Sequence, residues 1–228
     1  MENNRSSVSY PDAYRIYTGR SFASGVMWLS IGAVALFSGL MLLMAFLMFM
    51  DNDNTEETDY LFSVTLASIY CSMLVVMRMI MMFDKVSPGG KYFRTVKGGF
   101  DTFAKAQVIF IAEGAVAVMT FCAFLAVLDA LGIIEMGNSI GSCITLFITV
   151  FLARAIASFS RLINKPMTRT VITIMVFFTV NMIGIMLIET TNGKLGAVQI
   201  VSAAAAVVLT VISEKAVLSN YRKKHWDN

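Results

Sequence analysis

The sequence predicts an all-α membrane protein in which six helices cross a bilayer and both termini lie in the cytoplasm. Of the 228 residues, 57% are hydrophobic and only 14% are charged, whereas an ordinary soluble domain has about 25% charged residues. A bilayer can solvate so much apolar surface and water cannot. Long apolar runs and an alternating distribution of basic residues are the other two observations that predict this fold.

Six apolar runs reach the roughly 20 residues that a spanning helix needs. They are Ser24–Met50, Leu61–Phe83, Ala106–Leu131, Ile140–Ser160, Thr170–Ile188 and Ala197–Leu218. The chain therefore divides into three parts: a cytoplasmic or interfacial segment over 1–23, a six-helix transmembrane domain over 24–218, and a basic cytoplasmic tail over 219–228.

The segments between these runs set the orientation, because Lys and Arg accumulate in cytoplasmic loops. The segments around 51–60, 132–139 and 189–196 hold one basic residue, Lys194. Both termini fall on the opposite, basic side, so the number of spans is even. The plasma (inner) membrane is the expected location. The fourteen residues on the basic side are Arg5, Arg15, Arg20, Lys85, Lys91, Arg94, Lys97, Lys105, Arg161, Lys165, Arg169, Arg222, Lys223 and Lys224.

The inventory of reactive side chains argues against an enzyme. The single histidine is His225, and Cys71, Cys122 and Cys143 lie inside apolar runs without Cys-x-x-Cys spacing. The chain has no Gly-x-x-x-x-Gly-Lys phosphate loop. We therefore expect no catalytic residue, no metal site, no cofactor and no nucleic-acid partner; the lipid bilayer is the first expected partner.

The longest predicted cytoplasmic connection, from Asp84 to Lys105, is amphipathic. Its apolar residues gather on one side of a helix and its charged residues on the other. This pattern favours a helix that lies in the membrane interface or docks on a cytoplasmic partner; the alternative is a solvated basic loop that only enforces the topology. Gly98-Gly99 is expected to interrupt the helix. The apolar side comprises Tyr92, Phe93, Val96, Phe100 and Phe103, and the charged side Lys91, Arg94, Lys97, Asp101 and Lys105.

The segment before the first span also has a helical pattern. Ser9-Tyr10-Pro11-Asp12 is typical of a helix start, with proline in the first turn and an acidic residue near the positive end of the dipole. Tyr10, Tyr14 and Tyr17 then share one face, as in an interfacial anchor at the level of the lipid headgroups.

Five ionisable residues lie just inside the cytoplasmic ends of the predicted spans. A lone charge at this depth costs several kcal/mol, so these residues should form intramembrane ion pairs or extend to the interface. We expect Glu113 to pair with Arg78 or Arg154, and a structural role is favoured over an ion pathway. The five residues are Arg78, Glu113, Arg154, Glu214 and Lys215.

The chain resembles the permease subunits of ATP-binding-cassette exporters with six helices per subunit, and their short bacterial relatives. The resemblance depends on the amphipathic segment before the first span, the six spans, and the stretch from Pro88 to Val96. It implies a permease dimer with two separate ATPase subunits. It also implies that the connection between the second and third spans contacts the ATPase, through Lys91, Tyr92, Phe93, Arg94, Val96 and Phe100.

Two other classes of function stay open. One is a self-contained small transporter or substrate-binding membrane subunit, with a pocket lined by Ser142, Thr145, Thr149, Thr179 and Asn181. The other is a non-transporting scaffold or stress protein. A homo-oligomer is compatible with each class, because Gly25, Gly32 and Gly39 share a face of the first span that permits close helix packing.

Overall fold

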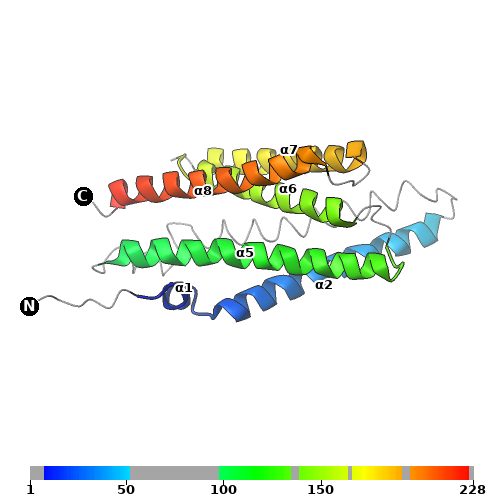
Figure 1. Cartoon of the computed structure of the whole chain (residues 1–228), viewed down its shortest axis with the longest axis horizontal. Coiled ribbons are helices and arrows are strands. Elements are labelled where there is room, and N and C mark those ends of the chain that lie inside the picture. Colours follow the sequence, from blue (N-terminus) through cyan, green and yellow to red (C-terminus); the bar gives the residue numbers. More distant parts are fainter. Residues whose placement is uncertain (1–7, 52–97, 135–138, 164–165, 192–195, 226–228) are drawn as a thin grey trace, which may run out of the picture.

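The computed structural model describes residues 8–51, 98–134, 139–163, 166–191 and 196–225. Every regular element in these ranges is an α-helix (Figure 1). The helices are α1 (Tyr10–Thr18), α2 (Phe22–Asp51), α5 (Gly99–Ala130), α6 (Ser139–Ser160), α7 (Pro166–Thr191) and α8 (Ala197–His225). The predicted second span, Leu61–Phe83, lies outside the described residues.

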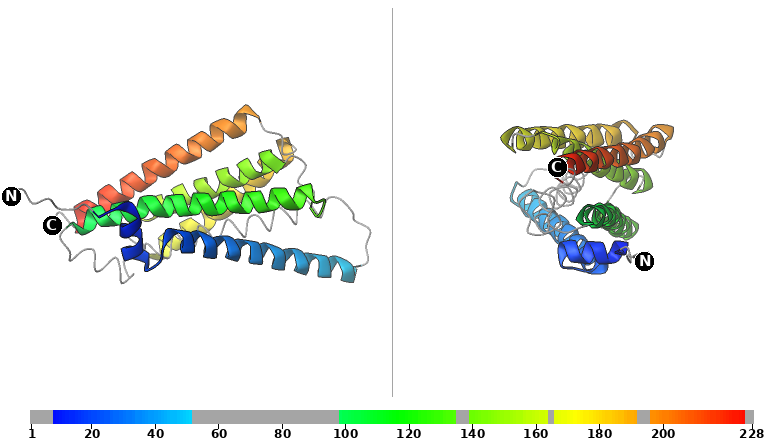
Figure 2. Two further views of the ribbon diagram at one scale, coloured as in Figure 1. Left: turned by 60° about the horizontal axis from the view of Figure 1, so that its bottom comes forward. Right: turned by 90° about the vertical axis from the view of Figure 1, so that its left-hand side faces the viewer.

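The long helices run side by side in two groups (Figures 1 and 2). Helix α5 packs against α1 and α2, while α6 packs against both α7 and α8. The two groups meet where α5 contacts α6. At this contact Cys122 and Cys143 face each other, with each sulfur 3.6–3.7 Å from the carbonyl oxygen of the other residue. Small side chains at this position let the two helices approach closely.

Four of the described helices are long and apolar enough to cross a membrane. The segments concerned are Phe22–Leu43, Gly99–Ala130, Ile140–Ser160 and Ala197–Lys223, and they overlap the predicted first, third, fourth and sixth spans. Helix α7 contains the predicted fifth span, Thr170–Ile188, which stays a prediction. Large apolar side chains on its outer surface, such as Met175, Phe178 and Met186, are more than 60% exposed, as expected for a surface in contact with lipid.

Two helices, α5 and α8, each extend seven residues beyond a predicted boundary. Helix α5 begins at Gly99, seven residues before the predicted start at Ala106, and α8 continues from Leu218 to His225. Apolar composition limits the membrane-spanning part of a helix, but backbone hydrogen bonding continues wherever the residues favour it. The last part of the predicted amphipathic segment, Gly99 to Lys105, is therefore the first two turns of α5, and residues 219–225 of the predicted tail are the last turns of α8.

The predicted helix start near the N-terminus is confirmed. Ser9 caps α1 by accepting a hydrogen bond from the backbone N–H of Asp12, and Pro11 lies in the first turn. Gly98 has a φ of +81° and immediately precedes α5, so α5 begins at the predicted interruption; the predicted helical residues before Gly98 lie outside the described residues. Helix α1 crosses the bundle at a steep angle instead of running along it (Figure 2).

Candidate functional site

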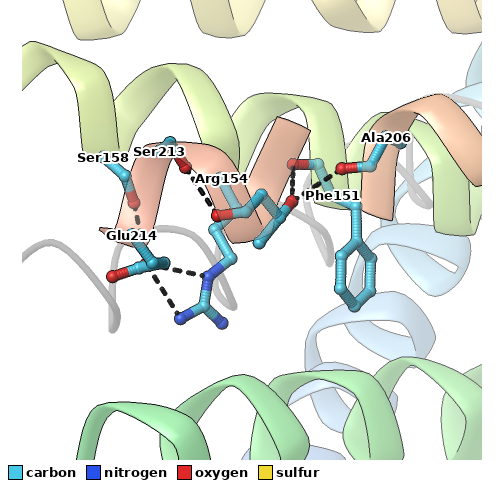
Figure 3. A network of polar contacts seen from close by, with 7 residues as sticks. Phe151, Arg154, Ser158, Ala206, Ser213 and Glu214 are labelled. Atoms are coloured by element: carbon cyan, nitrogen blue, oxygen red, sulfur yellow. Dashed lines mark hydrogen bonds and ion pairs between the residues drawn. The ribbon is translucent and has the colours of Figure 1, made fainter. Parts of the chain in front are cut away.

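The first part of the candidate site is a buried ion pair between α6 and α8. Arg154 and Glu214 are 2% and 5% exposed. The Nη2 and Nε atoms of Arg154 lie 3.2 Å and 3.4 Å from Oε1 of Glu214, and the hydroxyl of Ser158 donates to the same oxygen at 2.9 Å. Figure 3 shows the guanidinium and the Ser158 hydroxyl converging on this carboxylate.

The three contacts leave other polar atoms of the pair unused. Within the described ranges, Nη1 of Arg154 and Oε2 of Glu214 are buried without a hydrogen-bond partner, and Oε2 points away from the guanidinium (Figure 3). A buried polar atom normally has a partner, because desolvation without one costs about 1–3 kcal/mol. This centre can therefore still bind a water molecule or a polar group of a ligand.

Two buried hydroxyl groups of α8, those of Thr210 and Ser213, lie next to the ion pair (Figure 3). Thr210 donates to the carbonyl oxygen of Phe151 at 3.1 Å and to that of Ala206 at 2.8 Å, so it links α8 to α6. Ser213 donates to the carbonyl oxygen of Thr210 at 2.8 Å. Both hydroxyl groups are fully buried, and each is satisfied by backbone oxygen in a place where water is excluded.

The second part of the site is centred on Glu113 of α5, which is 1% exposed. The hydroxyl of Tyr14 on α1 donates to Oε2 of Glu113 at 2.7 Å. Gly25 of α2 approaches both groups so closely that a Cβ there would lie against the Tyr14 hydroxyl and 2.6 Å from Oε1 of Glu113. Three helices thus meet at this carboxylate, and the contact requires a residue without a side chain on α2.

Aromatic rings surround the Tyr14 contact. The Tyr14 ring is fully buried and lies 5.2 Å from that of Phe110. Tyr17 contacts Phe103 edge to face at 5.7 Å, and Phe103 contacts Tyr221 of α8 at 6.2 Å. Such pairs add to the hydrophobic contribution of the buried rings. This aromatic cluster joins α1, α5 and α8 at one end of the molecule.

The structure brings together some of the predicted ionisable residues. The ion partner of Arg154 is Glu214, so the expected pairing of Arg154 with Glu113 is not the arrangement found. The sequence places Glu113 and Glu214 at similar depth in the membrane, so it could not identify which of them pairs with Arg154. Lys215 is exposed, and Arg78 lies outside the described residues.

The predicted contact segment is described only at Phe100. This side chain is half-buried and lies 5.5 Å below the guanidinium carbon of Arg222 on α8, a cation–π contact between the first turn of α5 and the end of α8. The other members of the segment, Lys91, Tyr92, Phe93, Arg94 and Val96, lie outside the described residues.

The structure describes part of the predicted polar pocket lining, which stays a prediction. Thr145 and Thr149 are buried on α6, but their hydroxyl groups donate to the carbonyl oxygens of Gly141 and Leu146 in the same helix. Thr179 is exposed on α7. The side chain of Asn181 is not among those described. Intrahelical bonds of this kind satisfy a hydroxyl without a pocket.

Sequence reasoning missed the buried role of Tyr14 and Ser158. The i, i+4, i+7 spacing of Tyr10, Tyr14 and Tyr17 was a valid signal of a helical face, but it favoured the lipid interface over a protein contact. Ser158 lies one helical turn after Arg154, and that spacing is the signal that could have placed its hydroxyl beside the ion pair.

Within the described ranges, no group of three or more His, Cys, Asp or Glu side chains is arranged to hold a metal ion. The site can accept and donate hydrogen bonds, balance charge inside a membrane and join helices. In comparisons with known proteins, no family model, no curated protein and no solved structure matches this chain.

Proposed function

We propose that the chain is the permease subunit of an ATP-binding-cassette-type exporter, which moves a substrate across the inner membrane with a separate ATPase partner. The observation that supports this proposal best is the position of α1. This helix crosses the bundle and packs against the first turns of α5 (Figure 2), directly after the segment expected to contact the ATPase. A movement of that segment would therefore reach α1, α5 and α8 together.

The proposal includes six spans with both termini in the cytoplasm. Helix α2 ends and α5 begins at opposite ends of the bundle (Figure 1), which agrees with one further span between them. The start of α5, the end of α8 and α1 lie at one end (Figure 1). The basic residues of these three parts thus share a side, in agreement with the positive-inside rule.

Co-purification in a mild detergent tests the proposal. We expect the tagged protein to retain an ATPase, and we expect Tyr92→Ser and Phe93→Ser to release it, because both remove apolar area from the segment expected to dock on it. Met167→Ser is the matched control, since Met167 is 81% exposed on α7 and does not belong to that segment. Recovery of the protein without an ATPase would contradict the proposal.

A self-contained small transporter is the second candidate. The observation in its favour is the buried pair of Arg154 and Glu214 with its unused polar atoms, because ionisable residues inside membranes often mark substrate or ion pathways. This candidate predicts transport by the purified chain in vesicles without nucleotide. Glu214→Gln should abolish that transport, while Lys215→Gln should not.

A further inference from the structure

The outer surface of α1 differs from the surface packed on α5. The inner surface buries Ala13 and Tyr14 completely. Tyr10, at the start of the helix on the same side as Tyr14, is 49% exposed, and Ile16 on the outer surface is 52% exposed. Arg15 and Arg20 are exposed as well. Exposed apolar side chains next to arginines are typical of a helix that lies in the plane of a membrane interface.

Lys105 of α5 adds a third cation to this surface. Its ammonium group donates to the carbonyl oxygen of Val8 at 2.7 Å and lies 5.6 Å from the centre of the Tyr10 ring. These contacts attach the residues before α1 to α5 and keep the lysine at the outer surface. Asp12 and Asp101 are the exposed carboxylates nearby, and the Ser9 hydroxyl donates to the Asp12 carboxylate.

The level of α1 along α5 matches the edge of the apolar region. The contacts of α1 fall on α5 between Phe103 and Glu113, where the apolar part of α5 begins. Because α1 crosses the bundle at this level (Figure 2), we place its exposed surface at the boundary between the headgroup layer and the acyl chains. Anionic headgroups are the complementary partners for a basic surface at this depth.

We propose that the exposed surface around α1, formed by Tyr10, Arg15, Ile16, Arg20 and Lys105 of α5, binds anionic phospholipid headgroups. The guanidinium and ammonium groups contact the headgroup phosphates, and Tyr10 and Ile16 insert between the acyl chains next to them. This inference goes beyond the proposed transport function, since it requires only that the chain is inserted in a membrane.

Lipid retention by the purified full-length protein tests the inference. The protein is mixed in detergent with phosphatidylglycerol or phosphatidylcholine, and native mass spectrometry counts the lipids that remain bound. We expect preferential retention of phosphatidylglycerol. The double variant Arg15→Gln/Arg20→Gln should weaken that retention at least about fivefold, because each basic residue near an anionic surface contributes roughly that factor.

Three matched variants distinguish an effect of charge on lipid retention from an effect of misfolding. Arg15→Lys/Arg20→Lys keeps the charge and should keep the preference. Lys194→Gln removes a cation that the sequence places at the opposite side of the membrane, and it should change nothing. Asp12→Asn removes a neighbouring negative charge and should increase phosphatidylglycerol retention. This variant tests the role of charge while every basic residue of the surface is kept.

Equal retention of the two lipids by the unchanged protein would overturn the inference, and so would a loss of preference in Lys194→Gln as large as that in the double glutamine variant. Displacement of the lipid by inorganic phosphate would also overturn it, because the site would then recognise free phosphate and not a lipid. Each result is independent of ATPase co-purification, so failure here and failure of the proposed function are distinguishable.

Discussion

Glu113 and Glu214 are both buried carboxylates near the same end of the bundle, but their surroundings differ. Glu214 accepts from the guanidinium of Arg154 and from the hydroxyl of Ser158. Glu113 accepts from Tyr14 among closely packed aromatic rings. Glu214 is stabilised mainly by an opposite charge, whereas Glu113 is held by close packing as well as by a hydrogen bond. A membrane protein can therefore hold similar side chains at similar depth by two different physical means.

The largest expected effect is the loss of one charge from the ion pair. We expect Glu214→Leu to lower the free energy of unfolding by about 3–5 kcal/mol, because Arg154 is then buried without its opposite charge. Unfolding of the purified protein in detergent, followed by circular dichroism, measures this change. Lys215→Leu is the control, since this neighbouring lysine is exposed and its loss should leave stability nearly unchanged.

The double variant Arg154→Met/Glu214→Leu should recover most of the lost stability, because no unpaired charge is then buried. The coupling energy between Arg154 and Glu214 should also exceed that between Arg154 and Glu113 in equivalent cycles. A larger coupling with Glu113 would show that Arg154 prefers the other carboxylate, and the contrast drawn between the two centres would be wrong.

The second effect concerns the hydrogen bond to Glu113. Tyr14→Phe keeps the ring but removes the donor, and a hydrogen bond to a charged group contributes about 1.5–3 kcal/mol. We expect a loss of stability in that range in the same unfolding measurement. Tyr10→Phe is the matched control, because the Tyr10 side chain is about half exposed on the same helix. Equal effects of the two substitutions would argue against the buried contact.

The third effect tests the close packing around Glu113. Gly25→Ala places a methyl group against the Tyr14 hydroxyl and Glu113, and overpacking of this kind costs about 1–3 kcal/mol. Gly32→Ala is the control on the same helix: no described atom lies within 4 Å of a Cβ there, so the higher helix propensity of alanine should stabilise slightly.

The two Glu113 predictions should also interact. In a Tyr14→Phe background the hydroxyl nearest to the new methyl group is gone, so Gly25→Ala should cost less than it does alone. Strict additivity of the two free-energy changes would mean that Gly25 is required for another reason, and the view that shape selects the residue at position 25 would then fail.

The sequence was most informative where one physical requirement dominates. Apolar length predicted four segments that the structure also describes as candidate spans, because a bilayer requires about 20 apolar residues whatever the neighbours are. Ser9, Pro11 and Gly98 predicted local breaks and caps correctly, since capping depends on a few adjacent residues. Six spans and the orientation stay predictions that depend on charge counts.

The sequence was least informative about contacts between distant residues. Tyr14 and Glu113 are 99 positions apart, and Arg154 and Glu214 are 60 positions apart. Several carboxylates and cations lie at comparable depth, so the pairing depends on helix packing that no local pattern records. The same limit explains Gly25: three glycines share a face of α2, yet only Gly25 of these meets close neighbours among the described atoms.

The smallest expected effect concerns the hydroxyl that shares Glu214 with the ion pair. Ser158→Ala removes one of the three contacts to Oε1, and we expect a loss of about 1 kcal/mol in unfolding free energy. Ser213→Ala is the matched control, since Ser213 is equally buried but donates to a backbone oxygen of its own helix. Its loss should cost less, because the acceptor belongs to an α-helix and keeps its backbone hydrogen bond.

If Ser158→Ala lowers the unfolding free energy as much as Tyr14→Phe does, the environments of Glu214 and Glu113 are more alike than proposed. It would mean that the guanidinium alone does not satisfy Glu214, and that a neutral hydroxyl is as necessary there as it is at Glu113. The expected smaller cost follows from redundancy: after the substitution Oε1 of Glu214 still accepts from two N–H groups of Arg154. The opposite charge of Arg154 thus compensates for the loss of the neighbouring hydroxyl at Glu214.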